Sequence, residues 1–420
     1  MSKKYPLYKT TKSDQWYERA AKVIPAGVYG HLGPAEGQFI PVNRWPRFSD
    51  KAQGTYFWDV DGNKYIDYMC AYGPNVLGYC DPDVDAAALK QIELGNCTTS
   101  PNKVMVECAE LLVDTVNCAD WAFFAKNGND ATSGAIITAR AHTHKKKLIF
   151  FNGFYHGVAP MVQKIDYPGV LPEDVANNLY VDWDDIEGLK KVIAENDDIA
   201  ALIAQPYDHG NFYDNSFPKE GFWQEVRKLC TENGIILIVD DVRAGFRLDL
   251  AGSDHFFGFE ADMICFCKAL ANGYNMSAFC GKEFLKAAAS SLSYTGSYWM
   301  SAVPFAACIA CINKMKKLDT PKLFKELGTE LTDGLKAAGA EHGFDLVVSG
   351  APALFYLRIA NDDNMMLHQE WIAECVNRGA FFASHHNHFI NAALTHEDIA
   401  TTIEIAEDAF KAVKKNHPEL

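Results

Sequence analysis

The sequence has little that suits a membrane, a nucleic acid or a disulfide scaffold. It contains no apolar run long enough to span a bilayer, and its first residues lack the apolar segment of a secretory signal. Lysine and arginine number 39 against 54 acidic residues, so the net charge is −15 and no basic face is evident to neutralise phosphates. Twelve cysteines are too sparse for a disulfide framework in 420 residues. We therefore expect a cytoplasmic protein with reduced thiols and no nucleic-acid or membrane partner.

The length and the remaining composition favour a two-domain globular protein. A chain of 420 residues with 48% hydrophobic and 22% charged residues can bury a large core and should divide. Strand, helix and strand patterns alternate through the middle of the chain, which predicts a mostly parallel sheet. We expect residues 1–70 to form an N-terminal segment and hairpin, 71–318 a large domain, and 319–420 a small domain that the N-terminal segment joins.

Two short motifs have metal-site spacing, but neither offers a complete set of ligands. Cys308 and Cys311 lie in an apolar helical run without a second cysteine pair, which favours buried packing. The run from His385 to His388 places His386 and His388 on one face of a possible strand, with no third ligand at a suitable spacing. We predict no metal, and we prefer a substrate-pocket role for this run over helix-cap or surface roles.

Two candidate catalytic residues each directly follow an apolar run. The run Gly234–Val239 reads as a strand buried on both faces and is followed by Asp240, while Met263–Cys267 is followed by Lys268. Open α/β sheets place ligands at the carboxyl ends of such strands. A lysine in apolar surroundings is readily desolvated, which lowers its pKa and makes its amine nucleophilic toward a carbonyl.

A polar loop follows another predicted strand, Trp121–Ala125. The loop runs from Lys126 to Thr132 and precedes a helix expected over Ser133–His142. Backbone N–H groups at a helix start, together with the helix dipole, favour a phosphate. A simple helix cap is the alternative function for this loop.

These segments together resemble a known family. The stretch Leu237–Arg247 with Asp240-Asp241-Val242, followed by Lys268-Ala-Leu-Ala-Asn-Gly273, is similar to the signature of class III aminotransferases, which are pyridoxal 5′-phosphate enzymes of fold type I. The branch around glutamate-1-semialdehyde aminomutase is the most similar, and the resemblance extends from Ile24 to Ile399. It implies an α/β fold with a mostly parallel sheet in a large domain and a small α+β domain.

The resemblance also implies a role for individual residues. Lys268 would form the Schiff base with the cofactor, and Asp240 would pair with its pyridinium nitrogen. The other cofactor-binding positions that match the family pattern are Asn127, Gly128 and Asn129 at the phosphate, Tyr155, His156 and Val242 around the ring, Gln205 near the ring hydroxyl, and Thr295 and Ser297, where the family contacts the phosphate of the partner subunit of a homodimer. The expected substrate-pocket residues are Tyr72, His386 and Asn387.

The sequence departs from the aminomutase pattern at two places. Gly33 stands where the aminomutase has a carboxylate-binding arginine, and Arg44 or Arg47 could substitute or could be surface residues. Asn127 and Asn129 replace two hydroxyl residues, although backbone contacts to phosphate do not depend on side chains. We predict an aminotransferase for a small amine or amino acid. The alternatives are an isomerase of the same family, either an aminomutase or an amino-acid racemase, and a pyridoxal phosphate-binding protein without turnover.

Overall fold

The computed structural model describes residues 5–28 and 45–418, so Gly33 and Arg44 lie outside the described residues. The chain divides into two compact units. The terminal unit comprises residues 1–81, 211–215 and 322–420, and the central unit comprises 82–210 and 216–321. The sequence-based boundaries were expected after residues 70 and 318. Residues 71–81 group with the terminal unit because Tyr79 N donates to Gly54 O at 2.7 Å and Ala392 N donates to Val76 O at 2.9 Å.

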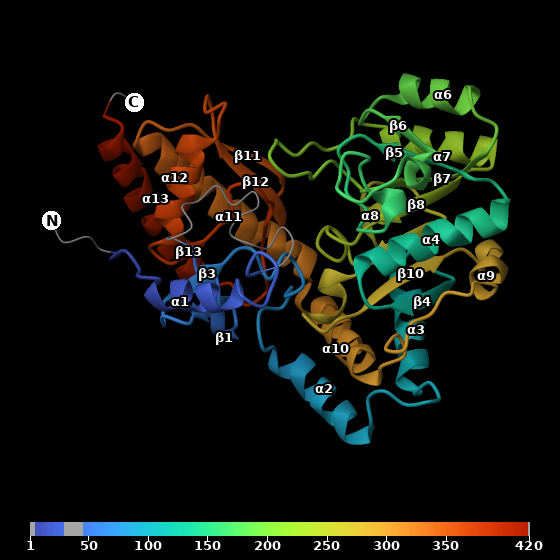
Figure 1. The fold of residues 1–420 in the computed structure, drawn as a ribbon, viewed down its shortest axis with the longest axis horizontal. Helices are drawn as coiled ribbons and strands as arrows, with labels where there is room; N and C mark the ends of the chain where they lie inside the picture. Colours follow the sequence, from blue (N-terminus) through green and yellow to red (C-terminus); the bar gives the residue numbers. More distant parts are fainter. Residues whose placement is uncertain (1–4, 29–44, 419–420) are drawn as a thin grey trace. The chain divides into compact units, whose positions relative to one another are not determined.

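A sheet of seven strands forms the middle of the central unit (Figure 1). Strand β10 is antiparallel to both of its neighbours, and the other neighbouring pairs are parallel. Strands β8 and β9 are adjacent, with Asp240 paired to Cys265, so their carboxyl ends lie side by side. In sheet order the strands are β4 (Trp121–Ala125), β10 (Ser277–Gly281), β9 (Met263–Phe266), β8 (Ile236–Asp240), β7 (Ile199–Ala204), β5 (Lys147–Phe151) and β6 (Asn178–Val181).

Helix α4 (Gly128–Thr143) packs closely on this sheet. It presents Ala131, Ala135, Ile136 and Ala139 to the strands, and the three small alanine side chains let the helix approach the apolar core. The other helices of this unit are α2 (Pro82–Leu94), α3 (Val104–Thr115), α5 (Pro172–Val175), α6 (Ile186–Ala194), α7 (Phe222–Asn233), α8 (Ser253–Phe256), α9 (Glu283–Ser290) and α10 (Ala302–Leu318), with short 3-10 turns η3 (Pro160–Val162) and η4 (Lys268–Ala271).

Helix α4 begins earlier than the sequence pattern predicted. The expected helix started at Ser133, but the observed one starts at Gly128. A capping box explains the difference, because the Asp130 carboxylate accepts a hydrogen bond from Asn127 N at 2.9 Å. Most of the predicted polar loop is therefore the first turn of the helix, and its N–H groups point out of the helix start.

The terminal unit brings the two ends of the chain into one sheet. The predicted hairpin forms from β2 (Tyr56–Asp59) and β3 (Lys64–Asp67), with Gly62 N donating to Asp59 O at 3.0 Å in the turn. Strand β3 also pairs in parallel with β13 (Ala380–Phe381), which joins the N-terminal segment to the C-terminal part. The remaining elements are β1 (Ser49–Gln53), β11 (Leu346–Ala351), β12 (Leu354–Ile359), β14 (His388–Phe389), α1 (Thr11–Ala20), α11 (Thr320–Glu341), α12 (Met366–Val376) and α13 (His396–Asn416).

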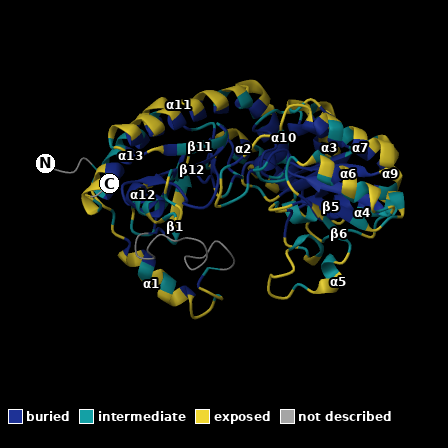
Figure 2. Cartoon of the chain, turned by 90° about the horizontal axis from the view of Figure 1, so that it is seen from above, coloured by how far each residue is buried: buried dark blue, intermediate teal, exposed yellow. Residues whose placement is uncertain are grey.

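The burial pattern follows this layering within each unit. Figure 2 shows the central strands as buried, whereas α11 and α1 carry exposed stripes. All five residues of β8 and all six of β7 are buried, as a parallel sheet covered on both faces requires. In the described part of the chain, no helix combines the length and apolar character needed to cross a membrane.

Candidate active site

Lys268 lies directly after β9, at the start of the turn η4. Its φ angle of +26° is in the left-handed region. This backbone conformation is unusual for residues other than glycine and is often found at functional sites. The residue is partly buried, so protein atoms exclude part of the water from around its amine. Burial lowers the pKa of the Lys268 amine to about 7, and the nearby Arg243 guanidinium contributes to the same shift. A large fraction of this amine is therefore neutral and nucleophilic at neutral pH.

Asp240 ends β8 and is held by a histidine from another part of the sequence. Its Oδ2 lies 2.7 Å from His156 Nδ1, and its Oδ1 accepts a weaker hydrogen bond from Val242 N at 3.2 Å. Asp240 and His156 are both buried. Because these contacts fix both carboxylate oxygens, Asp240 is presented in one orientation at the strand end next to Lys268.

The segment that carries Tyr155 and His156 is fastened to the start of helix α4. Asn129 Oδ1 accepts hydrogen bonds from Val158 N at 2.8 Å and Ala159 N at 2.7 Å. Thr132 Oγ1 donates to His156 O at 2.8 Å. The Asn129 side chain therefore positions the segment that follows β5.

A further contact to this segment comes from the end of β7. Gln205 Nε2 donates to Tyr155 O at 3.1 Å, and Gln205 itself is buried. Tyr155 keeps 52% of its surface exposed, so its ring is open to contact with a ligand. The hydrogen bond fixes the amide of Gln205 beside the tyrosine backbone.

Gly128 marks the closest approach between the helix start and the turn after Asp240. A Cβ atom at Gly128 would lie 2.7 Å from Cγ1 of Val242, closer than side chains pack. Asn127 is exposed at the N-cap. The half-buried Val242 thus lies against the predicted phosphate-binding turn, which brings together two of the sequence-predicted cofactor contacts.

The residues in the central unit fit pyridoxal phosphate. The site provides a nucleophilic amine, a buried carboxylate and the N-terminus of a helix. Two buried polar atoms, Gln205 Oε1 and His156 Nε2, have no hydrogen-bond partner among the described residues. Buried polar atoms in folded proteins are normally paired, so a polar ligand is the expected partner.

Two residues near Lys268 escaped the sequence analysis. Arg243 is buried, and its Nη1 donates to His209 O at 2.7 Å. His209 is fully buried, and burial, reinforced by the positive charge of Arg243, holds its pKa well below the usual range. Arg243 lies inside the signature segment Leu237–Arg247, and its charge could have marked it in the sequence as a residue of the site. His209 gave none, because an isolated histidine in a loop has no distinctive pattern.

Thr295 and Ser297 are exposed in the single chain. Their segment is anchored near α4, since Tyr294 donates its hydroxyl to Asp130 O at 2.9 Å. The Ser297 carbonyl accepts a weak hydrogen bond from the Cys97 thiol at 3.6 Å. Their assignment to the phosphate of a partner subunit stays a prediction.

The expected substrate-pocket residues lie together in the terminal unit. The rings of Tyr72 and His386 are in edge-to-face contact with centroids 5.4 Å apart, and His386 Nδ1 is 2.8 Å from Asn387 O. Burial raises the pKa of Tyr72 to about 12. Their role toward a substrate stays a prediction.

The histidine run does not form the strand face that its spacing suggested. Strand β14 contains only His388 and Phe389, so His386 precedes it. His388 Nε2 accepts a hydrogen bond from Ala383 N at 3.1 Å, and burial lowers the pKa of His388 to about 3. This histidine is therefore a neutral core residue. Within residues 5–28 and 45–418, no group of three or more histidine, cysteine or acidic side chains is arranged to hold a metal ion.

The structure also shows the contacts of Arg47, Cys308 and Cys311, which the sequence analysis considered. Arg47 pairs with Asp14 at 3.2 Å and lies over the ring of Tyr17. Cys308 and Cys311 are buried in α10, and the Cys311 thiol donates to Ala269 O at 3.4 Å. The expectation of buried packing for these cysteines is confirmed, and the Cys311 sulfur contacts the turn that carries Lys268.

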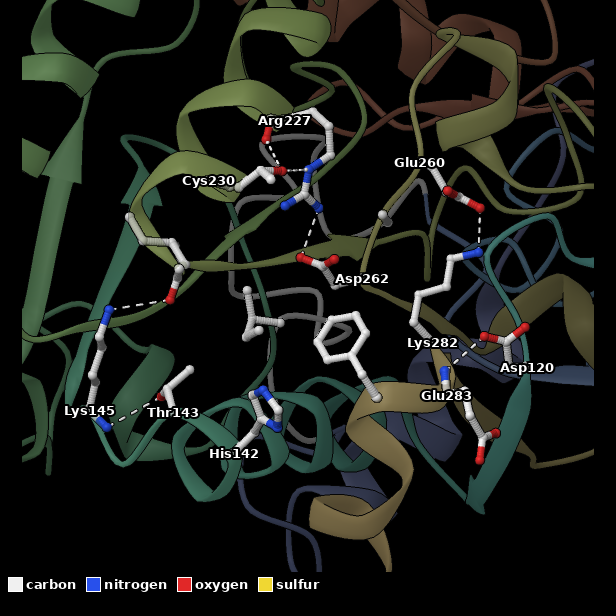
Figure 3. A pocket seen from close by; sticks show the side chains of 16 residues that line it. Asp120, His142, Thr143, Lys145, Arg227, Cys230, Glu260, Asp262, Lys282 and Glu283 are labelled. Carbon is white, nitrogen blue, oxygen red and sulfur yellow. Dashed lines mark hydrogen bonds and ion pairs between the residues drawn. The ribbon is translucent and has the colours of Figure 1, made fainter.

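A groove of about 820 Å³ lies at the opposite edge of the same sheet (Figure 3). Its residues surround the points where β8 and β9 begin, whereas Asp240 and Lys268 lie where these strands end. Two ion pairs lie among its lining residues, Arg227 with Asp262 at 2.8 Å and Lys282 with Glu260. This groove is therefore separate from the Lys268 site.

The chain is similar to several known proteins over nearly its whole length. The class-III aminotransferase family model matches residues 40–410. An aminopentol aminotransferase from Sphingopyxis macrogoltabida is 38% identical over 98% of this chain and 96% of its own length. A glutamate-1-semialdehyde 2,1-aminomutase from Desulforamulus reducens is 31% identical over 96% of this chain and 98% of its own length.

A solved structure is similarly close. The FumI protein of Sphingopyxis sp. MTA144, in its pyridoxal phosphate internal aldimine form, matches with a TM-score of 0.93 and 38% identity, covering 98% of each chain. The predicted fold type I architecture and the predicted cofactor are confirmed. The chain is a pyridoxal phosphate-dependent enzyme and belongs to the class III aminotransferase family.

Proposed function

We propose that this enzyme transfers the amino group of a small primary amine or amino acid to a carbonyl acceptor, using Lys268 as the residue that attaches the cofactor. The observation that carries the proposal is the pairing of a partly buried, readily neutral amine with a buried carboxylate at adjacent strand ends. Catalysis with pyridoxal phosphate needs an amine that attaches to the cofactor aldehyde and a carboxylate that pairs with the ring nitrogen. A binding protein without turnover would need neither group.

Each residue has a defined task in this proposal. The neutral amine of Lys268 would hold the cofactor at its aldehyde carbon, which is also the position that a substrate amine would occupy. When a substrate is bound, the Lys268 amine would be free to take a proton from the substrate carbon and return it at a neighbouring atom. Asp240, oriented by His156, keeps the ring nitrogen protonated. When bound, pyridoxal phosphate supplies a ring that withdraws the electron pair left behind by the departing proton.

Binding roles follow from the same contacts. Tyr155 and Val242 would cover opposite faces of the ring, and Gln205 would meet the ring hydroxyl with its unpartnered oxygen. Backbone N–H groups of Gly128 and Asn129 at the start of α4, next to Asn127, would hold the phosphate.

We also propose a homodimer in which Thr295 and Ser297 reach the phosphate held by the partner subunit. Apolar side chains exposed on α2 support an interface, because Leu89, Ile92 and Leu94 are 62%, 55% and 68% exposed. Tyr298, beside the two hydroxyl residues, is 70% exposed. Tyr72, His386 and Asn387 remain our candidates for the substrate pocket. Twelve cysteines that form no disulfide within the described residues support a reducing, cytoplasmic location.

The function can be tested by half-reactions. The holoenzyme, mixed with a panel of amines and amino acids, should convert the cofactor from its aldehyde to its amine form, and a keto acid should reverse the conversion. Proton exchange at the substrate carbon without any half-reaction would instead support an amino-acid racemase. An aminomutase, such as the relative that is 31% identical, would move the amino group within one substrate and would need no separate keto-acid acceptor.

A further inference from the structure

His209 is an unsatisfied histidine in the catalytic unit. Its side chain is completely buried, yet neither Nδ1 nor Nε2 has a hydrogen-bond partner in the described structure. Its ring is in edge-to-face contact with that of Tyr207, with centroids 4.8 Å apart. Burying an imidazole with both nitrogens unpaired is unfavourable, so the position calls for a polar ligand.

The location of His209 indicates which ligand it would meet. It lies on the loop that leaves the carboxyl end of β7, four residues after Gln205. Its ring lies close enough to Lys268 and His156 for their charges to influence its protonation. Ligands in open α/β folds bind at this edge of the sheet, which also carries Asp240.

Arg243 supplies a positive charge at the same place. The hydrogen bond from its Nη1 to His209 O, at 2.7 Å, ties the guanidinium to the histidine backbone. Its charge also acts on Lys268 and on Tyr155. The positive charges of Arg243 and Arg247 lower the pKa of the Lys268 amine, and the negative charge of Asp240 raises it.

We propose that His209 and Arg243 together receive the carboxylate of an amino-acid or keto-acid substrate. This inference rests on the proposed function and adds a substrate class to it. A neutral imidazole has one N–H to donate, and a guanidinium offers charge-assisted hydrogen bonds to the same anion. The pair also gives this chain a carboxylate-binding group although Gly33 occupies the aminomutase arginine position.

The test uses holoenzyme and two matched amines. Alanine and isopropylamine differ only in the replacement of a methyl group by a carboxylate, so their half-reactions report on that group. We expect His209→Phe and Arg243→Met to raise the concentration of alanine needed for half-maximal rate by about 10-fold or more relative to that of isopropylamine, so that any change at Lys268, which both amines share, cancels in the comparison. His209→Gln keeps an N–H donor and should retain most of the alanine response.

Propanoate binding provides a readout that does not require turnover. Calorimetry should show the same weakening of propanoate affinity in His209→Phe and Arg243→Met. Arg227→Met is the matched control, because Arg227 pairs with Asp262 at the opposite edge of the sheet. Equal losses for alanine and isopropylamine, or propanoate affinity unchanged in both site variants, would overturn the proposal. Failure of the proposed function would appear separately, as holoenzyme in which Lys268 carries no cofactor.

Discussion

His156 Nδ1 lies 2.7 Å from Asp240 Oδ2, although 84 residues separate the two in the sequence. The contact is buried, and Val242 N occupies the other carboxylate oxygen at 3.2 Å. The histidine is a positioning residue, because it acts on the cofactor ring through the orientation of Asp240. The catalytic carboxylate is thus prepared before any ligand arrives.

Replacing His156 by Phe should slow turnover while leaving the cofactor attached. Loss of a hydrogen bond to a buried charge corresponds to a decrease in kcat of about 10- to 100-fold. Absorbance of the bound cofactor and steady-state rates measure the two effects separately. His255→Phe is a matched control, since His255 and Asp249 form an exposed pair at the same 2.7 Å distance. Equal losses in both variants would contradict the role given to His156.

The pKa of Lys268 predicts how cofactor attachment depends on pH. The folded-state pKa of about 7 lies below the ordinary value of 10.5, so the amine is mostly protonated below pH 7 and mostly neutral above it. The rate at which apoenzyme takes up pyridoxal phosphate should therefore rise through about pH 7 and then level off. Stopped-flow absorbance at a series of pH values measures this profile.

Arg243→Met should move that midpoint upward, because it removes a positive charge that opposes protonation of Lys268. The same stopped-flow series on the variant provides the comparison. A wild-type midpoint near 10.5, or a downward shift in the variant, would show that the amine is not desolvated as described.

Gly128→Ala should weaken cofactor binding through a steric conflict. Its Cβ would lie 2.7 Å from Val242 Cγ1, so the helix start must shift away from the turn. Equilibrium dialysis should show a loss of at least about 10-fold in affinity for pyridoxal phosphate, of the size expected for overpacking. Adding Val242→Ala removes the obstructing methyl groups and should restore part of the affinity. No recovery in the double variant would mean that the glycine is needed for another reason.

Asn129→Ala should destabilise the protein. The amide oxygen accepts two backbone hydrogen bonds, from Val158 and Ala159, and its loss leaves both donors without this partner. We expect the free energy of unfolding to fall by about 1–3 kcal/mol in urea titrations. Asn152→Ala, which removes an exposed contact to Asp182, should change it by less than about 0.5 kcal/mol. Similar changes in both variants would argue against a special function of Asn129.

The sequence allowed the main chemistry to be located because its signals are local. Asp240 and Lys268 each follow a short, fully apolar run, and such runs become central strands whose ends form the site. The capping box at Asn127 was a weaker signal. The sequence analysis therefore placed the start of α4 at Ser133, whereas the helix begins at Gly128.

Contacts between distant segments could not be predicted in this way. The bond between His156 and Asp240 depends on the relative placement of the segments after β5 and β8, which no local pattern specifies. The unsatisfied ring of His209 becomes visible only when its surroundings are known. Residues 71–81 joined the terminal unit through pairing with Gly54, a contact that composition does not indicate.

The most direct test of the account is the identity of the lysine that carries the cofactor. Borohydride reduction of the holoenzyme, followed by peptide mass spectrometry, should place the pyridoxyl group on Lys268 alone. Lys126 is the informative competitor, because it is buried and its burial lowers its pKa to about 8. A label on Lys126, or an unlabelled Lys268, would contradict the central claim.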